Sequence, residues 1–535
     1  MLHDSFRGVA PELSALPDDV DALKRQVVSL YEKIDALTET IQLLQRRSFG
    51  RKSEQTPVPG QRELFAQAAG TEEVRVLSPQ EAASYRIPVR SHARRARGGR
   101  KPLPRDLPEV DVVHDIAEGD KVCGCGATLS RIGEEELRQL GVIAPQFYVV
   151  RHVRPKYACR ACGGEKTPAP VVRIAPAPKQ LIPKSIVTPE LLAWVLTGKW
   201  VDGLPFYRLE KMLRRYGVEI SRETLCFWMQ QGARRLLPLV GLLREAILRG
   251  EVVQADETPV QVLREPGRSA TTKSYLWAFR GGDPKHPSLV FEYHPSRGAK
   301  VPLEFLQGYE GVLQTDGYDG YHEVGRQPGI VHAGSMAHAR RKFVDAAAVA
   351  KGTGLADYAL NEFFGPLYAI EAEARRLEMS SDARRDLRAS HAKPILDAFR
   401  SWLDQRSLET PPSLALGKAI GYAIKEWSTL IRYADDGRIE IDTNLIENAI
   451  RPYCVGRRAW LFHDSPEGAK AGAALYSIVE SAKANSLEPY HYLRYLFNRL
   501  LTMEPDDPFA DLLPHRLTPQ DIVLPQPTLP AAPGG

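Results

Sequence analysis

The chain has 535 residues and a nearly balanced charge, with 71 basic against 66 acidic side chains and a formal net charge of +5. Its 43% hydrophobic and 26% charged residues are typical of globular proteins, which excludes wholesale disorder and allows several domains. No run approaches the roughly 18 apolar residues of a membrane span, and the first residues lack the apolar stretch of a signal peptide. We therefore expect a cytoplasmic, multidomain protein.

A heptad repeat near the N-terminus predicts a coiled coil over residues 18–47. Apolar residues recur at alternating spacings of three and four, and β-branched residues alternate with leucines: Val20, Leu23, Val27, Leu30, Ile34, Leu37, Ile41 and Leu44. This order favours a parallel two-stranded coil over a helix that packs on its own domain. We therefore expect a homodimer or a higher oligomer.

A basic segment follows, within a linker that we place at residues 48–108. Its cations lie among glycines and prolines, which favour an extended chain: Arg94, Arg95, Arg97, Arg100 and Lys101. Such an arm can follow a phosphate backbone, and a solvated linker accounts for the charge equally well. We treat these five side chains as candidate DNA-binding residues.

Four of the six cysteines form two close pairs, in a segment that we place at residues 109–170. Cys123 and Cys125 make the first pair, Cys159 and Cys162 make the second, and glycines flank both. Two tight turns that each supply two thiolates suit one tetrahedral zinc ion with a structural role. Strand-like residues precede the second pair, so we expect a small zinc-ribbon-like module in preference to four buried thiols.

A helix pair belongs to a helical region that we place at residues 185–248. The second helix starts at Ser221, whose side chain can cap it, and its first turn could present Arg222 and Thr224 to base edges. This spacing is that of a helix-turn-helix DNA-binding motif. Helix pairs also occur as plain packing units, so the surrounding sequence has to decide between the two interpretations.

From Glu251 the chain changes to apolar runs of strand length in the order β-β-β-α-β-β, which starts a ribonuclease-H-like fold. The first and fourth strands of that fold are neighbours, so Asp256 and Asp316 would meet at one edge of the sheet. Pro259 predicts a bulge or an early strand end just after Asp256. Glu447, on a later short helix, could supply a third carboxylate. Three such groups suit two magnesium ions that promote displacement at phosphorus.

Ordered motifs along nearly the whole chain resemble the transposases of insertion sequence family sixty-six, whose core is similar to that of other acidic-triad transposases. The motifs are RRSFGRKSE after the coil, the cysteine module, LPFYRLEKMLRRYGVEISRETL, QADETPV, TDGYDGY, AHARRKF, RIEIDTNLIENAIRPYCVGRRAWLF and LYSIVESAKANSLEPYHYL. The resemblance implies that Asp256, Asp316 and Glu447 are the catalytic triad and the magnesium ligands. Asp319, in the same DGYDGY run, receives no role.

The chain departs from this family pattern in two places. Cys123 and Cys125 are one residue closer together than the usual first pair of the cysteine module. Ser335 and Met336 stand before ARRKF where the family usually has Cys and Trp. All three acids of the implied triad are present.

These observations predict a DNA transposase that uses two magnesium ions, with manganese as a substitute, to cleave the ends of its insertion sequence and join the 3′ ends to target DNA. Arg451, on the Glu447 helix, is a further candidate for a phosphate contact. The expected partners are the terminal inverted repeats, target DNA and small accessory proteins of the same element, in the nucleoid and away from membranes. A catalytically silent DNA-binding descendant and a nuclease without strand transfer are the alternatives.

The expected fold class is multidomain, with an N-terminal coiled coil, a small zinc-ribbon-like module, a helical DNA-binding region and an α/β ribonuclease-H-like catalytic core. The core takes residues 250–343 and 439–463, and a helical insertion takes residues 344–438. A C-terminal helical element over residues 464–504 and a disordered Pro-rich tail over residues 505–535 complete the chain.

Overall fold

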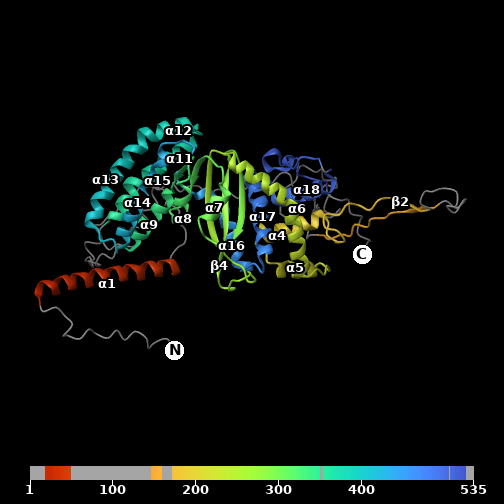
Figure 1. The fold of residues 1–535 in the computed structure, drawn as a ribbon, viewed down its shortest axis with the longest axis horizontal. Helices are drawn as coiled ribbons and strands as arrows, with labels where there is room; N and C mark the ends of the chain where they lie inside the picture. Colours follow the sequence, from red (N-terminus) through yellow and green to blue (C-terminus); the bar gives the residue numbers. More distant parts are fainter. Residues whose placement is uncertain (1–18, 50–145, 159–171, 350–353, 505, 526–535) are drawn as a thin grey trace, which may run out of the picture. The chain divides into compact units, whose positions relative to one another are not determined.

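The structure is a computed structural model that describes residues 19–49, 146–158, 172–349, 354–504 and 506–525 (Figure 1). The chain divides into two compact units, the first made of Met1–Lys52 and Val150–Gly535 and the second of Ser53–Val149. The candidate cations of the basic segment and all four paired cysteines lie outside the described residues. No helix in the described ranges is both long enough and apolar enough to cross a bilayer.

The predicted N-terminal helix is present as α1 (Val20–Phe49). Asp19 caps it, because its carboxylate accepts from the backbone N–H groups of Asp21 and Ala22. The structure describes the side chains of seven of the eight seam residues. Between 48 and 63% of each is exposed: Val20, Val27, Leu30, Ile34, Leu37, Ile41 and Leu44. The single chain therefore leaves these seven apolar side chains about half exposed or more.

A five-stranded mixed sheet forms the centre of the first unit (Figure 1). Its order is β5-β4-β3-β6-β7, so the first and fourth strands along the chain are neighbours, as the sequence predicts. The first three strands are antiparallel, and β6 and β7 run parallel to β3. The elements are β3 (Val252–Gln261), β4 (Lys273–Asp283), β5 (His286–His294), α7 (Lys300–Phe305), β6 (Gly311–Gln314), α8 (Asp319–Val324) and β7 (Ile330–Ala333).

The prediction of a bulge or early strand end after Asp256 is wrong. β3 continues to Gln261 and pairs with β4 in one unbroken register from Gln254 onwards, with Pro259 opposite Tyr275. The pairing of β3 with β6 stops at Gln254, so that side of β3 is open when the chain reaches the proline. Pro259 is tolerated because it lacks its N–H at an edge, where no neighbouring strand needs it.

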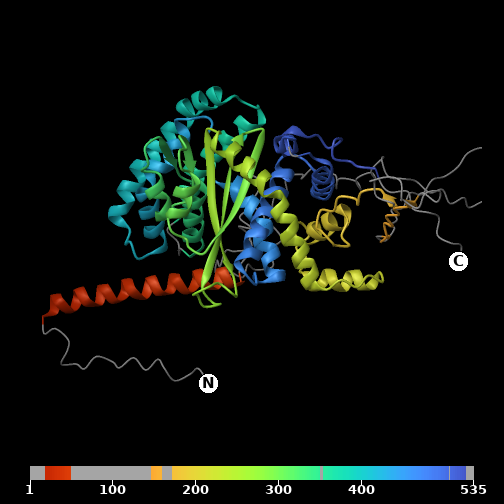
Figure 2. The same ribbon diagram turned by 45° about the vertical axis from the view of Figure 1, so that its right-hand side comes forward.

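Helices from both ends of the unit cover β4 and β5. α6 (Arg222–Leu248) and α17 (Pro466–Ala484) pack against these strands, and Figure 2 shows the sheet between them and the helices that follow β7. The edge of β5 is closed by α17, because Ser477 Oγ and Ser481 Oγ accept from the N–H groups of Phe291 and Leu289 at 2.8 and 2.9 Å. Covering an edge strand in this way satisfies backbone groups that would otherwise attract another chain.

The helix pair expected before the sheet is made of α5 (Phe206–Arg215) and α6. Gly217, with a φ of +77°, makes the turn between them, a conformation that favours glycine. α4 (Pro189–Trp200) precedes the pair and packs against α18 (Pro489–Thr502) near the other end of the chain. Earlier in the sequence, the short strand β1 (Lys156–Ala158) directly precedes the second cysteine pair. It is antiparallel to β2 (Val172–Ile174).

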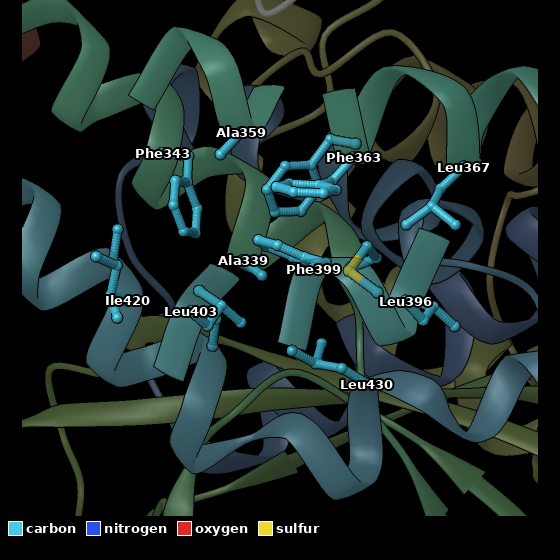
Figure 3. Packing of buried hydrophobic residues seen from close by; sticks show 14 of the residues in the cluster. Ala339, Phe343, Ala359, Phe363, Leu367, Leu396, Phe399, Leu403, Ile420 and Leu430 are labelled. Atoms are coloured by element: carbon cyan, nitrogen blue, oxygen red, sulfur yellow. The ribbon is translucent and has the colours of Figure 1, made fainter. Parts of the chain in front are cut away.

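The segment between β7 and the Glu447 helix is helical and has an aromatic core (Figure 3). Phe363 stacks on Phe399 at 4.7 Å, and Phe343 contacts Phe399 edge-on. The same segment also contains a buried ion pair between Arg388 and Glu371, at 2.7 Å. The elements are α9 (Met336–Val349), α10 (Leu355–Ala359), η3 (Leu360–Phe364), α11 (Gly365–Arg376), α12 (Ser381–Leu387), η4 (Arg388–Ala392), α13 (Lys393–Glu409), α14 (Ala415–Lys425), α15 (Trp427–Leu430) and η5 (Ile431–Ala434).

The prediction of a disordered tail is wrong for residues 506–525. This stretch contains the short helices η6 (Phe509–Leu512) and η7 (Pro514–Arg516), and Leu512, Leu513 and Ile522 are buried. Tyr492 donates from its hydroxyl to the carbonyl of Leu512, and Arg494 donates to the carbonyls of Leu524 and Pro525. Two polar side chains of α18 therefore fix a segment whose proline content suggests disorder.

Candidate active site

Asp256 lies within β3, and Asp316 lies two residues after the end of the parallel neighbour β6. β3 and β6 pair through Gln254 and Gln314, and each aspartate follows its glutamine by two residues. The two glutamine side chains are joined by a hydrogen bond of 2.9 Å, which ties the strands together just before the acids. Neighbouring strands are about 4.8 Å apart, so this register places the two aspartates close enough to interact electrostatically.

Glu447 reaches the same place from the first turn of α16 (Asn444–Trp460). Thr443, the residue before the helix, holds its hydroxyl 3.1 Å from both Ser335 Oγ and Glu447 Oε1. Ser335 Oγ also accepts from the backbone N–H of Thr443 at 3.2 Å. Ser335, which departs from the family pattern, therefore fixes the start of the helix that carries Glu447.

Two basic side chains of α9 lie near the Glu447 carboxylate. His338 Nδ1 is 3.8 Å from Oε1, and Arg341 Nη2 is 3.7 Å from Oε2. These distances exceed a hydrogen bond, so the contacts are electrostatic. Both residues belong to the AHARRKF motif, whose position in the sequence gives no sign that it faces an acid a hundred residues later.

The three acids interact electrostatically. Burial raises the pKa of Asp256 well above its usual value, and the negative charges of Glu257, Asp316 and Glu447 raise it further. The N–H of Glu257 donates to Asp256 Oδ1 at 2.8 Å and partly offsets these effects. The structure therefore brings together the acids that the sequence singled out, as a set whose charges repel one another in the absence of a cation.

A fourth carboxylate, missed by the sequence reasoning, lies next to Asp256. The side chain of Glu257 is 2% exposed and pairs with Arg297 at 2.6 Å. The Tyr321 hydroxyl also donates to Glu257 Oε2 at 2.6 Å. Burial raises the pKa of Glu257, although both partners oppose the shift. Its only signal in the sequence is its position in the QADETPV motif.

Tyr318 links the Arg297–Glu257 ion pair to Asp316. The guanidinium of Arg297 lies over the Tyr318 ring, 3.9 Å from its centroid, and the Tyr318 hydroxyl donates to the Arg297 carbonyl. The N–H of Tyr318 donates to Asp316 Oδ1 at 3.0 Å. Glu257, Arg297 and Tyr318 are thus joined by contacts into one frame next to Asp256 and Asp316.

The donor set fits magnesium by its chemistry. Carboxylate oxygens from separate elements are the ligands that this hard cation prefers. No three His, Cys, Asp or Glu side chains within the described ranges have the arrangement of a formed metal site. The side chains of Asp256, Asp316 and Glu447 would therefore have to move closer together to bind a cation. The charge of the cation would relieve their repulsion.

The other predicted residues lie away from these acids or on the surface. Asp319 is exposed and pairs with Lys425 at 2.8 Å, which lowers its pKa. Ser221 caps α6 as predicted, by accepting from the N–H of Thr224. Arg222 is exposed beside it, and Arg451 is exposed one turn beyond Glu447 on α16.

Family models match most of the chain. The model described as "Transposase IS66 family" matches residues 184–471, and the "IS66 C-terminal element" matches residues 477–515. The "zinc-finger binding domain of transposase IS66" matches residues 120–163, which include all four paired cysteines. A leucine-zipper model described as "Transposase C of IS166 homeodomain" matches residues 36–112.

Full-length relatives come from Sinorhizobium fredii. The uncharacterized protein y4qI is 30% identical over 95% of this chain and 98% of its own length. The uncharacterized protein y4jD is 32% identical over 91% of this chain and 94% of its own length. With motifs, sheet and family models in agreement from the leucine zipper to the C-terminal element, the chain belongs to the IS66 transposase family.

Proposed function

We propose that the chain is a metal-dependent DNA transposase with a ribonuclease-H-like core, in which Asp256, Asp316 and Glu447 bind the metal. The observation that carries this proposal is the pairing of Gln254 with Gln314, two residues before Asp256 and Asp316, together with the electrostatic interaction of Asp256 with Asp316 and Glu447. The order of the mixed sheet supports the ribonuclease-H-like assignment.

Two magnesium ions would activate the attacking oxygen and stabilise the leaving one. The residues of the chain hold the carboxylates in place: Ser335 and Thr443 fix the start of α16, and Tyr318 orients Asp316. Water would be the nucleophile for cleavage, and the 3′ hydroxyl that cleavage releases would then attack target DNA. One arrangement of carboxylates serves both steps because each is a displacement at phosphorus.

The remaining parts of the chain hold DNA and partners in this proposal. The basic segment with Arg94, Arg95, Arg97, Arg100 and Lys101, the first turn of α6 and Arg451 contact DNA, and the paired cysteines bind one structural zinc. The uncovered seam of α1 pairs with a second copy, so that two element ends are held together.

Oligonucleotide duplexes of the element ends test this function. The protein with magnesium should nick them and join them to a target plasmid, whereas Asp256→Asn and Glu447→Gln should do neither. Asp319→Asn is the control, because it removes an exposed carboxylate of the TDGYDGY motif, which also carries Asp316, and should keep activity. Nicking without joining would indicate a nuclease, and full cleavage by Asp256→Asn would exclude this triad.

A further inference from the structure

The connection that leaves α16 contains a strained turn. Leu461 has a φ of 67° and a ψ of −55°, the values of a γ-turn with positive φ. The N–H of Phe462 donates to the carbonyl of Trp460 at 2.9 Å, which is the hydrogen bond of that turn. A leucine rarely adopts this conformation, so the surrounding structure must impose it.

Both sides of the turn are firmly held. Trp460 is buried and packs edge-on against Trp200 and Tyr453. On the other side, the N–H of His463 donates to the carbonyl of Gln261 at 2.9 Å, so the chain continues alongside the end of β3. The residues on both sides of Leu461 are therefore held by packing and hydrogen bonding.

The turn presents two large apolar side chains to solvent. Leu461 is 60% exposed and its neighbour Phe462 is 41% exposed. Single exposed apolar residues are common on protein surfaces. Two adjacent ones at the tip of a strained and anchored turn indicate a binding role, because conformational strain at a surface persists where it serves a function.

A basic hollow lies beside Leu461. It has a volume of about 510 Å³ and is lined by Lys273 of β4 and by Arg457 and Arg458 of α16, together with polar and apolar residues but no carboxylate. Three cations around an apolar tip match the chemistry of duplex DNA, which offers phosphates on its outside and stacked bases within.

The turn lies on the same side of β3 as the acids. Arg457 donates to Thr258 Oγ1 at 3.2 Å, two residues beyond Asp256. From Asp256 to Gln261 the strand advances about 17 Å, at roughly 3.3 Å per residue. From Glu447 to Leu461 the helix advances about 21 Å, at 1.5 Å per residue. Either distance corresponds to about five or six base pairs of DNA.

We propose that Leu461 and Phe462 form a wedge that enters the base stack of an element end, about five base pairs from the phosphate that the acids cleave. Lys273, Arg457 and Arg458 bind the phosphates on either side. The inference rests on the proposed transposase function. Inserted apolar side chains unstack and kink a duplex, and such a bend would let the DNA end reach the recessed carboxylates.

A duplex of the terminal inverted repeat, labelled with 2-aminopurine at one position at a time, tests the wedge. Calcium in place of magnesium allows binding without cleavage. The parent protein should raise the fluorescence several-fold at one or two positions near the fifth base pair. The variant Leu461→Gly with Phe462→Ala should bind the duplex with an affinity within about twofold of the parent, lose the fluorescence increase and nick about tenfold more slowly.

Two controls address folding and specificity. Leu461→Gly alone suits the positive φ, so its melting temperature should not fall below that of the parent. Val455→Ala removes an apolar side chain of α16 that is 61% exposed and should leave the fluorescence increase intact. A mismatch at the unstacked position should restore nicking by the double variant, because the duplex is then already open.

The outcomes separate this inference from the proposed function. Nicking by the parent without a fluorescence increase at any position would overturn the wedge and leave the transposase intact. A fluorescence increase without nicking would support the wedge and overturn the catalytic proposal. No binding of end DNA would overturn both, and an undiminished increase in the double variant would overturn the wedge alone.

Discussion

Asp256 and Asp316 each lie two residues beyond the paired glutamines Gln254 and Gln314 of neighbouring parallel strands, Asp256 within β3 and Asp316 just after the end of β6. The two aspartates come from segments sixty residues apart, and the register alone makes them neighbours. Burial and mutual repulsion raise the pKa of Asp256, so the site stores unfavourable electrostatic energy that a bound cation would release.

Removing one of these charges should stabilise the metal-free protein. Asp256→Asn eliminates a buried carboxylate that three neighbouring carboxylates repel, so the melting temperature in a chelator should rise. Nicking should fall at least about a hundredfold, because metal-ion catalysis contributes several kcal/mol. Calorimetry with and without magnesium measures the change in stability, since the parent should gain stability from magnesium and the variant much less, and the oligonucleotide assay measures the loss of nicking. A metal-free variant less stable than the parent would contradict this account.

The Arg297–Glu257 pair should stabilise the frame around the acids. Arg297→Ala leaves the buried Glu257 carboxylate with Tyr321 as its remaining side-chain donor, and should lower the free energy of unfolding by about 1–3 kcal/mol. Adding Glu257→Gln should recover part of that loss. Urea denaturation of the parent, both single variants and the double variant gives the coupling energy.

The solvent-exposed ion pair of Arg264 with Asp464 provides a comparison for the buried Arg297–Glu257 pair. Arg264→Ala breaks the contact with Asp464, in which both side chains are more than half exposed, and should cost less than about 1 kcal/mol. Equal losses for Arg264→Ala and Arg297→Ala would show that burial of Glu257 does not govern the strength of its pair.

His463 should make stability depend on pH. Burial first, and then the charge of Lys199, lower its pKa from 6.5 to about 3. Between those values the unfolded chain binds more protons than the folded one, so the free energy of unfolding falls as the pH falls from about 6.5 towards 3. Between pH 7.5 and pH 5 the loss due to His463 should be roughly 2 kcal/mol.

Urea denaturation at both pH values measures this loss. His463→Gln should be less stable at pH 7.5, because the ring packs against Trp460 at 4.9 Å, but its stability should change less on going to pH 5. His391→Gln, at an exposed position, should keep the pH dependence of the parent. A His463→Gln protein with the full pH dependence would assign the effect to other groups.

The exposed seam of α1 should pair two chains. Leu30→Glu with Ile34→Lys places charges in the centre of the seam and should weaken association by several kcal/mol. Lys33→Ala with Asp35→Ala changes exposed positions beside the seam and is the control. Light scattering coupled to size exclusion, with and without end DNA, measures the assembly. If the seam variant still brings two ends together, dimerisation arises elsewhere.

The cysteine module should hold one zinc per chain. Cys159→Ser removes one of the four thiolates, so zinc content should fall and residues near 120–165 should unfold while the sheet remains intact. Metal analysis and limited proteolysis check the two parts of this expectation. Unchanged zinc content in the variant would exclude Cys159 as a ligand.

The sequence by itself determined the elements and the acids of this protein. Heptad spacing specified α1, apolar runs specified the strand order, and the resemblance to a transposase family singled out Asp256 in the first strand, Asp316 after the fourth strand and Glu447 on a later helix. These features are local, because periodicity and capping depend on residues within a few positions of one another. The order β-β-β-α-β-β was then enough to predict that Asp256 and Asp316 meet.

Only the tertiary structure decided the contacts between distant segments. Glu257 pairs with Arg297, forty residues away, and Tyr492 and Arg494 order a proline-rich tail that composition predicted to be disordered. Pro259 stays within β3 because its neighbour β6 ends early, and Leu461 adopts a positive φ because Trp460 and His463 are anchored on either side. Each outcome depends on which side chains the fold brings together, and no local pattern encodes that.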